Sequence, residues 1–226
     1  MLLLVTDTSG KNGTVALARS GERSPHEVQM IEVAPLAGGT FSAQLVPQIA
    51  ALLHKLGLSK ADIDGFVVVS GPGSFTGLRV GLAAIKALAE ILKKPIVPVS
   101  LLELLALAGR AEGKVVAVLD GGRGEVYFGA YEIAGESVQV LQEQLLSKAE
   151  FLSAASESTV ATPDPALAAV ARDAGLSVVA VALSSPEMIA QFGWKKMQAG
   201  ETVAPEQLEA NYMRRSGAEL FVKKNF

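Results

Sequence analysis

The stretch that decides the fold runs from Phe66 to Gly81 and reads FVVVSGPGSFTGLRVG. It begins with the solid apolar run Phe66–Val69, which is typical of a strand buried on both faces of a sheet. A glycine-rich loop, Gly71–Gly77, then leads into a helix that the apolar pattern predicts over Leu78–Leu92, ended by Pro95. A buried strand, a glycine loop and a helix in this order indicate an α/β fold.

The residues on either side extend this pattern through the first half of the chain. The apolar run Leu2–Val5 and the alternating Thr14–Ala18 flank a polar Asn-Gly turn, which is a hairpin signature. Ser59 and Asp62 have the spacing of a capping box and predict a short turn. The remaining predicted elements are a strand over Val28–Val33, a helix over Ser42–Leu56, a strand over Ile96–Val99 and a helix over Leu101–Ala108.

A second hairpin pattern opens the other half of the chain. Strands are predicted at Lys114–Leu119 and Glu125–Tyr131, joined by the polar loop Asp120–Gly124. Further predicted elements are a strand near Val138–Leu145, helices over Asp164–Ala174 and Pro186–Ala199, and a strand at Val178–Val181. Because the hairpin motif recurs, we expect two related lobes, 1–103 and 104–226. The alternative for the last helix is that it packs back on the first lobe.

Composition excludes several classes of protein. The 226 residues include no cysteine, so disulfide scaffolds, cysteine-ligated metals and cysteine nucleophiles are ruled out. A hydrophobic share of 50% and a net charge of −3 indicate a well-buried globular protein that does not grip nucleic acid by itself. The histidines, His26 and His54, form no His-x-x-x-His pair, so no metal site is expected. The N-terminus has no export signal and no stretch is long enough for a membrane helix, which predicts a cytoplasmic protein.

Two loops could hold a phosphate group. Asp7-Thr8-Ser9 places a carboxylate and two hydroxyls at the end of a strand, and the Gly71–Gly77 loop forms a backbone nest at a helix N-terminus, where anions bind. The candidate residues are Asp7, Thr8, Ser9, Gly73, Ser74, Thr76, Gly77 and Arg79. The alternative is purely structural: a polar hairpin, and a tight turn in which Ser74 or Thr76 caps the helix. Neither a Walker motif nor the dinucleotide fingerprint is present.

The helix over Leu78–Leu92 is apolar nearly all round, with Arg79, Lys86 and Glu90 as its charged residues. Such a helix must be covered on nearly all sides. Either the fold wraps it completely or a second chain packs on it, approaching closely over the small residues Gly81, Ala84 and Ala87.

Taken together, these motifs resemble the TsaB (YeaZ) family. The most specific match is Gly71–Gly81, GPGSFTGLRVG. Supporting matches lie along almost the whole chain: Asp7-Thr8-Ser9, Leu45-Val46-Pro47, Val99–Glu103, Gly124–Tyr127 and Tyr212-Met213-Arg214. Two segments depart from the family pattern. Where the family usually has His-Ser-Glu, this chain has Phe41-Ser42-Ala43. Where the family usually has Asp-Ala-Arg, it has Asp120-Gly121-Gly122, and the arginine follows one position later as Arg123.

The resemblance implies a two-lobed actin and Hsp70-like ATPase (ASKHA) fold and a non-catalytic role. Such a subunit supports threonylcarbamoyl transfer to N6 of adenosine 37 in tRNA by binding the catalytic paralogue TsaD and, with it, the ATPase TsaE. ATP and metal then belong to the partner subunits, tRNA is bound through the complex, and this chain requires no cofactor. TsaD-type proteins hold their metal with a His-x-x-x-His pair that this chain lacks.

The same resemblance places the partner interface on the helices over Ser42–Leu56 and Leu78–Leu92. The predicted interface residues are Leu45, Ile49, Leu52, Leu82, Ala84, Ile85, Ala87 and Leu88. Without its partner, a chain with such an apolar face is expected to form a homodimer. The alternative function is an independent ATPase or kinase of the same fold that uses Asp7 and the Gly71–Gly77 loop; ATP turnover that is lost in Asp7→Ala would distinguish it.

Overall fold

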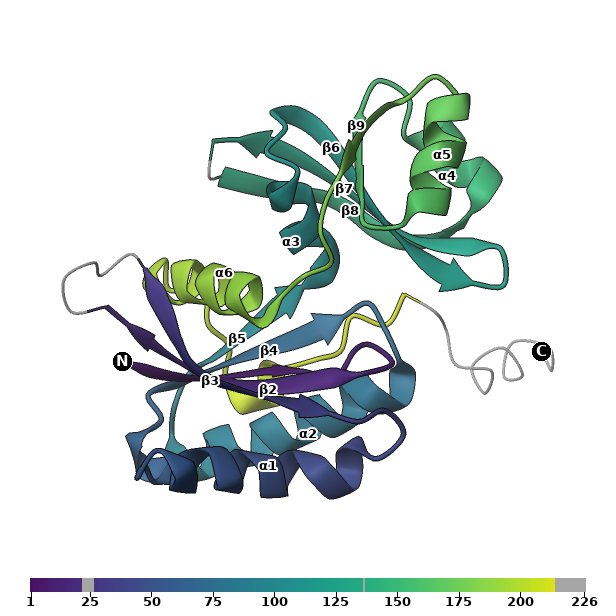
Figure 1. Cartoon of the computed structure of the whole chain (residues 1–226). Helices are drawn as coiled ribbons and strands as arrows, with labels where there is room; N and C mark the ends of the chain where they lie inside the picture. The colour runs from purple at the N-terminus through teal and green to yellow at the C-terminus, as the bar shows by residue number, and fades with distance from the viewer. Residues whose placement is uncertain (22–26, 136, 214–226) are drawn as a thin grey trace, which may run out of the picture. The chain divides into compact units, whose positions relative to one another are not determined.

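The computed structural model describes residues 1–21, 27–135 and 137–213, so that His26 and Arg214 lie outside the described part of the chain. The chain divides into two compact units (Figure 1). The first comprises Met1–Leu104 and Ser184–Ala210, and the second comprises Leu105–Leu183 and the described residues from Asn211 onward. The predicted helix near 186–199 thus belongs to the first unit.

The first unit is built on a five-stranded sheet with the order β3-β2-β1-β4-β5. The first three strands form an antiparallel meander, and β4 and β5 run parallel to β1. The strands are β1 (Leu2–Asp7), β2 (Gly13–Ser20), β3 (Val28–Leu36), β4 (Gly65–Gly71) and β5 (Ile96–Ser100). Every residue of β4 is buried, as its uninterrupted apolar run predicts.

Helices cover both faces of this sheet (Figure 1). Helix α1 (Phe41–Lys55) and helix α2 (Phe75–Leu92) lie side by side on one face, and α6 (Pro186–Gln198) packs on the other. Helix α3 (Leu101–Ala108) follows β5. Two short 3-10 helices complete the unit, η1 (Lys60–Asp62) at the predicted capping box and η2 (Pro205–Gln207) after α6.

The second unit repeats this plan. Its sheet has the order β10-β9-β6-β7-β8, again an antiparallel meander extended by two parallel strands. The elements are β6 (Gly113–Gly122), β7 (Glu125–Ala134), β8 (Ser137–Ser147), α4 (Lys148–Ala154), β9 (Thr159–Thr162), α5 (Pro165–Asp173) and β10 (Ser177–Ala180). The order βββαβαβα therefore occurs twice along the chain, which confirms the two-lobed α/β fold expected from the recurring hairpin.

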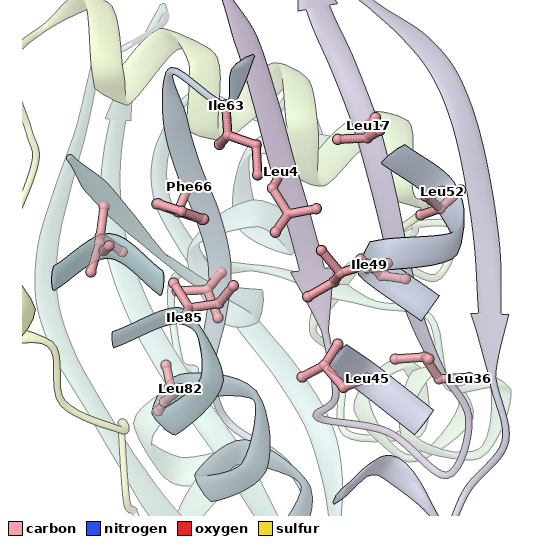
Figure 2. Packing of buried hydrophobic residues seen from close by; sticks show 14 of the residues in the cluster. Leu4, Leu17, Leu36, Leu45, Ile49, Leu52, Ile63, Phe66, Leu82 and Ile85 are labelled. Atoms are coloured by element: carbon pink, nitrogen blue, oxygen red, sulfur yellow. The ribbon is translucent and has the colours of Figure 1, made fainter. Parts of the chain in front are cut away.

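The core of the first unit lies between its sheet and the helix pair α1 and α2. Figure 2 shows Leu45, Ile49 and Leu52 of α1 and Leu82 and Ile85 of α2 directed toward the sheet. All five are buried, and they pack in one cluster with strand residues that include Leu4, Leu17 and Phe66. Burying each such side chain stabilises the fold by about 1.5–3 kcal/mol. These five predicted interface residues thus form the intramolecular core, which corrects their assignment to a partner surface.

Candidate functional site

The two predicted phosphate loops lie against each other at the carboxyl ends of β1 and β4. The backbone N–H of Ser74 donates to the carbonyl oxygen of Ser9 at 2.6 Å, and the Thr8 hydroxyl donates to the carbonyl oxygen of Gly77 at 2.8 Å. Thr8 and Ser9 are both buried. Strands β1 and β4 are parallel neighbours, so their carboxyl ends meet at the same edge of the sheet.

The Asp7 carboxylate is turned onto its own loop. Its Oδ1 atom accepts hydrogen bonds from the backbone N–H of Ser9 at 2.8 Å and from the Ser9 hydroxyl at 2.6 Å. This is the Asx-turn arrangement that the structural alternative predicts for a polar hairpin. The hydroxyl and amide of Ser9 therefore satisfy Oδ1 of this carboxylate from within the loop.

Close packing of the loops explains the glycines of the motif. A Cβ atom at Gly73 would come within 2.7 Å of the Ser9 Cβ atom, and one at Gly77 would collide with the carbonyl oxygen of Thr8. A Cβ atom at Gly81 would meet the Thr8 hydroxyl in the same way. These glycines thus allow the β1 loop to lie directly on the N-terminal turns of α2.

The start of α2 carries the remaining candidates. Ser74 is the N-cap residue, and its hydroxyl accepts from the backbone N–H of Gly77 at 3.3 Å. Thr76 and Arg79 are exposed, and the Arg79 guanidinium stacks on the exposed Phe75 ring at 3.8 Å from its centroid. The structure therefore brings all eight candidates to one edge of the first sheet, where Ser74 has the capping role of the structural alternative.

The hairpin between β6 and β7 ends in a tight turn at Arg123 and Gly124. Both residues have positive φ values, 58° and 81°, as a type I′ turn requires. The Asp120 carboxylate accepts from the backbone N–H of Gly122 at 3.1 Å, and the Arg123 side chain is exposed. The loop thus uses its acidic residue to hold its own backbone.

Neither a metal cluster nor a membrane helix is found in the part of the chain that the structure describes. Among residues 1–21, 27–135 and 137–213, no three His, Asp or Glu side chains gather closely enough to bind a metal ion. Within the same residues, no helix combines the length and apolar character needed to cross a bilayer.

The outward side of the α1–α2 pair is apolar and carries little charge. Its most exposed large apolar side chains are Val46 of α1 and Ile91 of α2, which are 55% and 67% exposed. Of the predicted interface residues, Ala87 is exposed and Ala84 and Leu88 are half-buried. We define the outer helix face by its exposed or half-buried apolar residues: Ala43, Val46, Pro47, Ala50, Val80, Ala83, Ala84, Ala87, Leu88 and Ile91.

The sequence prediction did not include Val46, Val80, Ala83 and Ile91 of the outer helix face, because it took mainly the large apolar residues of each helix, with Ala84 and Ala87 as the small ones. The spacing of Val80, Ala84, Ala87 and Ile91 is helical and could have shown that they share one stripe.

Comparison with known proteins gives consistent matches. Residues 33–207 match the family model described as TsaD, tRNA N6-adenosine threonylcarbamoyltransferase. The tRNA threonylcarbamoyladenosine biosynthesis protein TsaB of Bacillus subtilis (strain 168) is 33% identical over 159 residues, 70% of this chain and 67% of that protein. TsaB of Escherichia coli (strain K12) is 28% identical over 230 residues, 96% of each chain. A Pseudomonas aeruginosa crystal structure, described as an uncharacterized protein with similarity to peptidase YeaZ, aligns with a TM-score of 0.70 at 26% identity, covering 94% of this chain and 99% of that one.

The doubled βββαβαβα topology, with glycine loops at the ends of parallel strands, defines a protein of the actin and Hsp70-like (ASKHA) class. Within this class, the TsaB sequences and the YeaZ structure match most of the chain and identify one family. The chain belongs to the TsaB (YeaZ) family.

Proposed function

We propose that this chain is a non-catalytic subunit in the biosynthesis of threonylcarbamoyladenosine on tRNA. In this role it binds the catalytic paralogue TsaD through the outer helix face and keeps it active, and the assembled pair provides the surface for the ATPase TsaE and for tRNA. The names of the TsaB relatives support the pathway. The observation that carries the scaffold role is the outer helix face itself.

That face has the composition of a binding surface. Interface cores are depleted in charged residues. On α2, the helically spaced stripe Val80, Ala84, Ala87 and Ile91 carries no charged residue, although Arg79, Lys86 and Glu90 lie elsewhere on the same helix. Its alanines and Pro47 let a second helix approach closely, while Val46 and Ile91 are large enough to fill gaps in a partner. Since α1 and α2 are held rigidly by the core beneath them, binding costs little conformational entropy.

The closed loops support a role without catalysis. The Asp7 carboxylate is engaged by Ser9, and the Ser74 N–H of the glycine loop is directed at the Ser9 carbonyl. A phosphate that used the Ser74 N–H, or a metal ion that used Oδ1 of Asp7, would have to displace these internal hydrogen bonds.

Binding to purified TsaD tests the proposal directly. Replacing Ala87 with Arg places a long charged side chain on the centre of the outer helix face, and we expect the dissociation constant measured by calorimetry to rise at least about 100-fold. The matched control is Ala169→Arg, in which the alanine is also exposed but lies on α5 of the second unit; this variant should bind as the wild type does.

Unchanged binding of the Ala87→Arg variant, with the fold intact by circular dichroism, would reject the outer helix face as the TsaD site. The alternative enzyme function has its own readout. ATP turnover by the isolated chain that disappears in Asp7→Ala would overturn the non-catalytic role.

A further inference from the structure

Strand β8 forms one edge of the second sheet. Its inner side pairs with β7 along the whole strand, from Ser137 opposite Ala134 to Ser147 opposite Glu125. In the part of the chain that the structure describes, no strand pairs with its outer side. An edge strand of this kind presents a row of backbone N–H and C=O groups on which another extended segment can pair.

The equivalent edge strand of the first unit, β3, is protected against such pairing. Pro35 lies near its end and has no N–H to donate. Glu32 places a charge on the strand, and the Lys55 ammonium of α1 lies 2.7 Å from its carboxylate. Helices α1 and α6 both contact β3. Charges, prolines and covering helices are the means by which proteins keep a sheet edge unpaired.

Strand β8 carries few of these features. Its residues include no proline, and Glu143 is the one charged residue among them. Val140 and Leu141, in the middle of the strand, are 51% and 50% exposed. The edge of the second sheet therefore combines an unpaired backbone with two neighbouring apolar side chains that are open to solvent.

A β-bulge lies at this apolar pair. Val140 is opposite Tyr131 of β7 and Gln142 is opposite Ala130, so that Leu141 between them has no partner on β7. A bulge bends the strand and increases its twist, which disfavours long, flat pairing with another edge strand. A short extended segment fits this edge better.

The charge of the second unit decides which kind of segment fits. Strands β7 and β8 carry Glu125, Glu132 and Glu143 and neither lysine nor arginine. Between Leu105 and Leu183, ten Asp and Glu residues stand against five Lys and Arg. A second copy of this unit would bring like charges together, whereas a basic segment would be attracted to the edge.

We propose that β8 is a docking edge for a short, extended and basic segment of a partner protein, which adds to the second sheet as a further strand. Main-chain hydrogen bonds along β8 supply the affinity, and side chains of the segment supply the specificity. Its apolar side chains contact Val140 and Leu141, and its lysines or arginines lie near the glutamates of β7 and β8. This edge belongs to a different unit from the outer helix face.

Amide hydrogen exchange of residues 137–147 in the full chain tests this edge with a defined probe. The probe is the acetylated and amidated peptide KVTVKVK, in which valine alternates with polar residues. At about 1 mM it should slow the exchange of 137–147 at least about tenfold, because it gives the outer amides of β8 a partner. The peptide EVTVEVE, with glutamate in place of lysine, should leave the exchange unchanged because like charges repel.

Two variants with the same added charge locate the binding site. Leu141→Lys places a cation beside Val140 on the edge, and the KVTVKVK peptide should then no longer slow the exchange of 137–147. The matched control is Leu183→Lys, at a leucine outside the strand that is 73% exposed, and this variant should keep the tenfold slowing.

Exchange that KVTVKVK leaves at the wild-type rate, or slows equally in Leu141→Lys, would overturn the docking edge. Equal slowing by EVTVEVE would overturn the preference for a basic segment. Slow exchange without peptide would also overturn the proposal: a dependence on protein concentration would assign the edge to a second copy, and loss of protection on deletion of 214–226 would assign it to those residues.

Discussion

At the scale of single residues, Thr8 joins the two loops of the candidate site. Its hydroxyl is buried and donates to the Gly77 carbonyl at 2.8 Å, in the first turn of α2. We expect Thr8→Val, which keeps the shape and removes the donor, to lower the free energy of unfolding by about 1 kcal/mol. Urea unfolding at 25 °C measures this change. Thr76→Val on the exposed side of the same turn is the control and should stay within about 0.5 kcal/mol; an equal loss at both sites would contradict the special role of Thr8.

Ser59 and Asp62 give a residue-scale prediction that depends on pH. The backbone N–H of Ser59 and then its hydroxyl, at 2.7 and 2.9 Å from the Asp62 carboxylate, hold the pKa of that carboxyl below its ordinary value. The stabilisation is thus fully present above the ordinary aspartate pKa and is lost as the pH falls through the lowered pKa. Ser59→Ala removes only the hydroxyl, so the pKa of Asp62 should rise part of the way, as seen by NMR titration. Ser59→Thr keeps a hydroxyl and should leave the pKa unchanged; a Ser59→Ala titration like the wild type would reject the hydroxyl's contribution.

At the scale of elements, α1 contains a proline in its interior. Pro47 has no N–H to donate to the carbonyl oxygen of Ala43 one turn earlier, and its side chain is exposed on the outer helix face. Pro47→Ala restores a donor, so we expect the free energy of unfolding to rise by on the order of 1 kcal/mol. Ala50→Gly, one turn later on the same face, should instead lower it by about 1 kcal/mol. Loss of stability in Pro47→Ala would show that the helix has adapted to the proline.

Local patterns were enough to predict most elements because each element carries its own signal. The helix predicted at Ser42–Leu56 is found at Phe41–Lys55, where apolar residues recur at helical spacing. The second helix begins at Phe75, three residues before its predicted start, because Ser74 acts as its cap. By contrast, α4 and β9 were not predicted. Strand β9 is only four residues long, and the capping box of α4, Ser147 with Glu150, was the signal that could have revealed that helix.

The candidate site was predictable in its members and less so in its chemistry. The motif residues could be chosen from the sequence, since glycines and hydroxyls cluster at two strand ends. The Asx turn of Asp7 with Ser9 is local and agrees with the structural alternative. The contact of the Ser74 N–H with the Ser9 carbonyl joins residues 65 positions apart, and no local pattern encodes it. For the same reason, the sequence could not show which stripe of α2 faces the sheet.

At the scale of the whole molecule, the two sheets share one topology, but the helices that pack on them differ in length. In the first unit, the α1–α2 pair follows β3 and β4 with 15 and 18 residues, whereas the equivalent helices α4 and α5 have 7 and 9. The longer pair extends an apolar outer face that its short counterparts do not provide. The two units thus share a framework, and the greater length of the α1–α2 pair distinguishes the proposed partner surface.

An exposed apolar face without its partner is expected to associate with itself. We therefore expect the isolated chain to form homodimers at micromolar concentration in sedimentation velocity, and Ile91→Glu, a charge on the outer helix face, to shift the dimer to monomer. Leu141→Glu is the matched control, because Leu141 is a similarly exposed apolar residue, 50% against 67%, on the edge strand β8 of the second unit. It should leave the dimer intact. A dimer that survives Ile91→Glu and dissociates in Leu141→Glu would show that the chains associate through the β8 edge. A wild-type chain that sediments only as a monomer would show that the outer helix face is stable in water without a second copy.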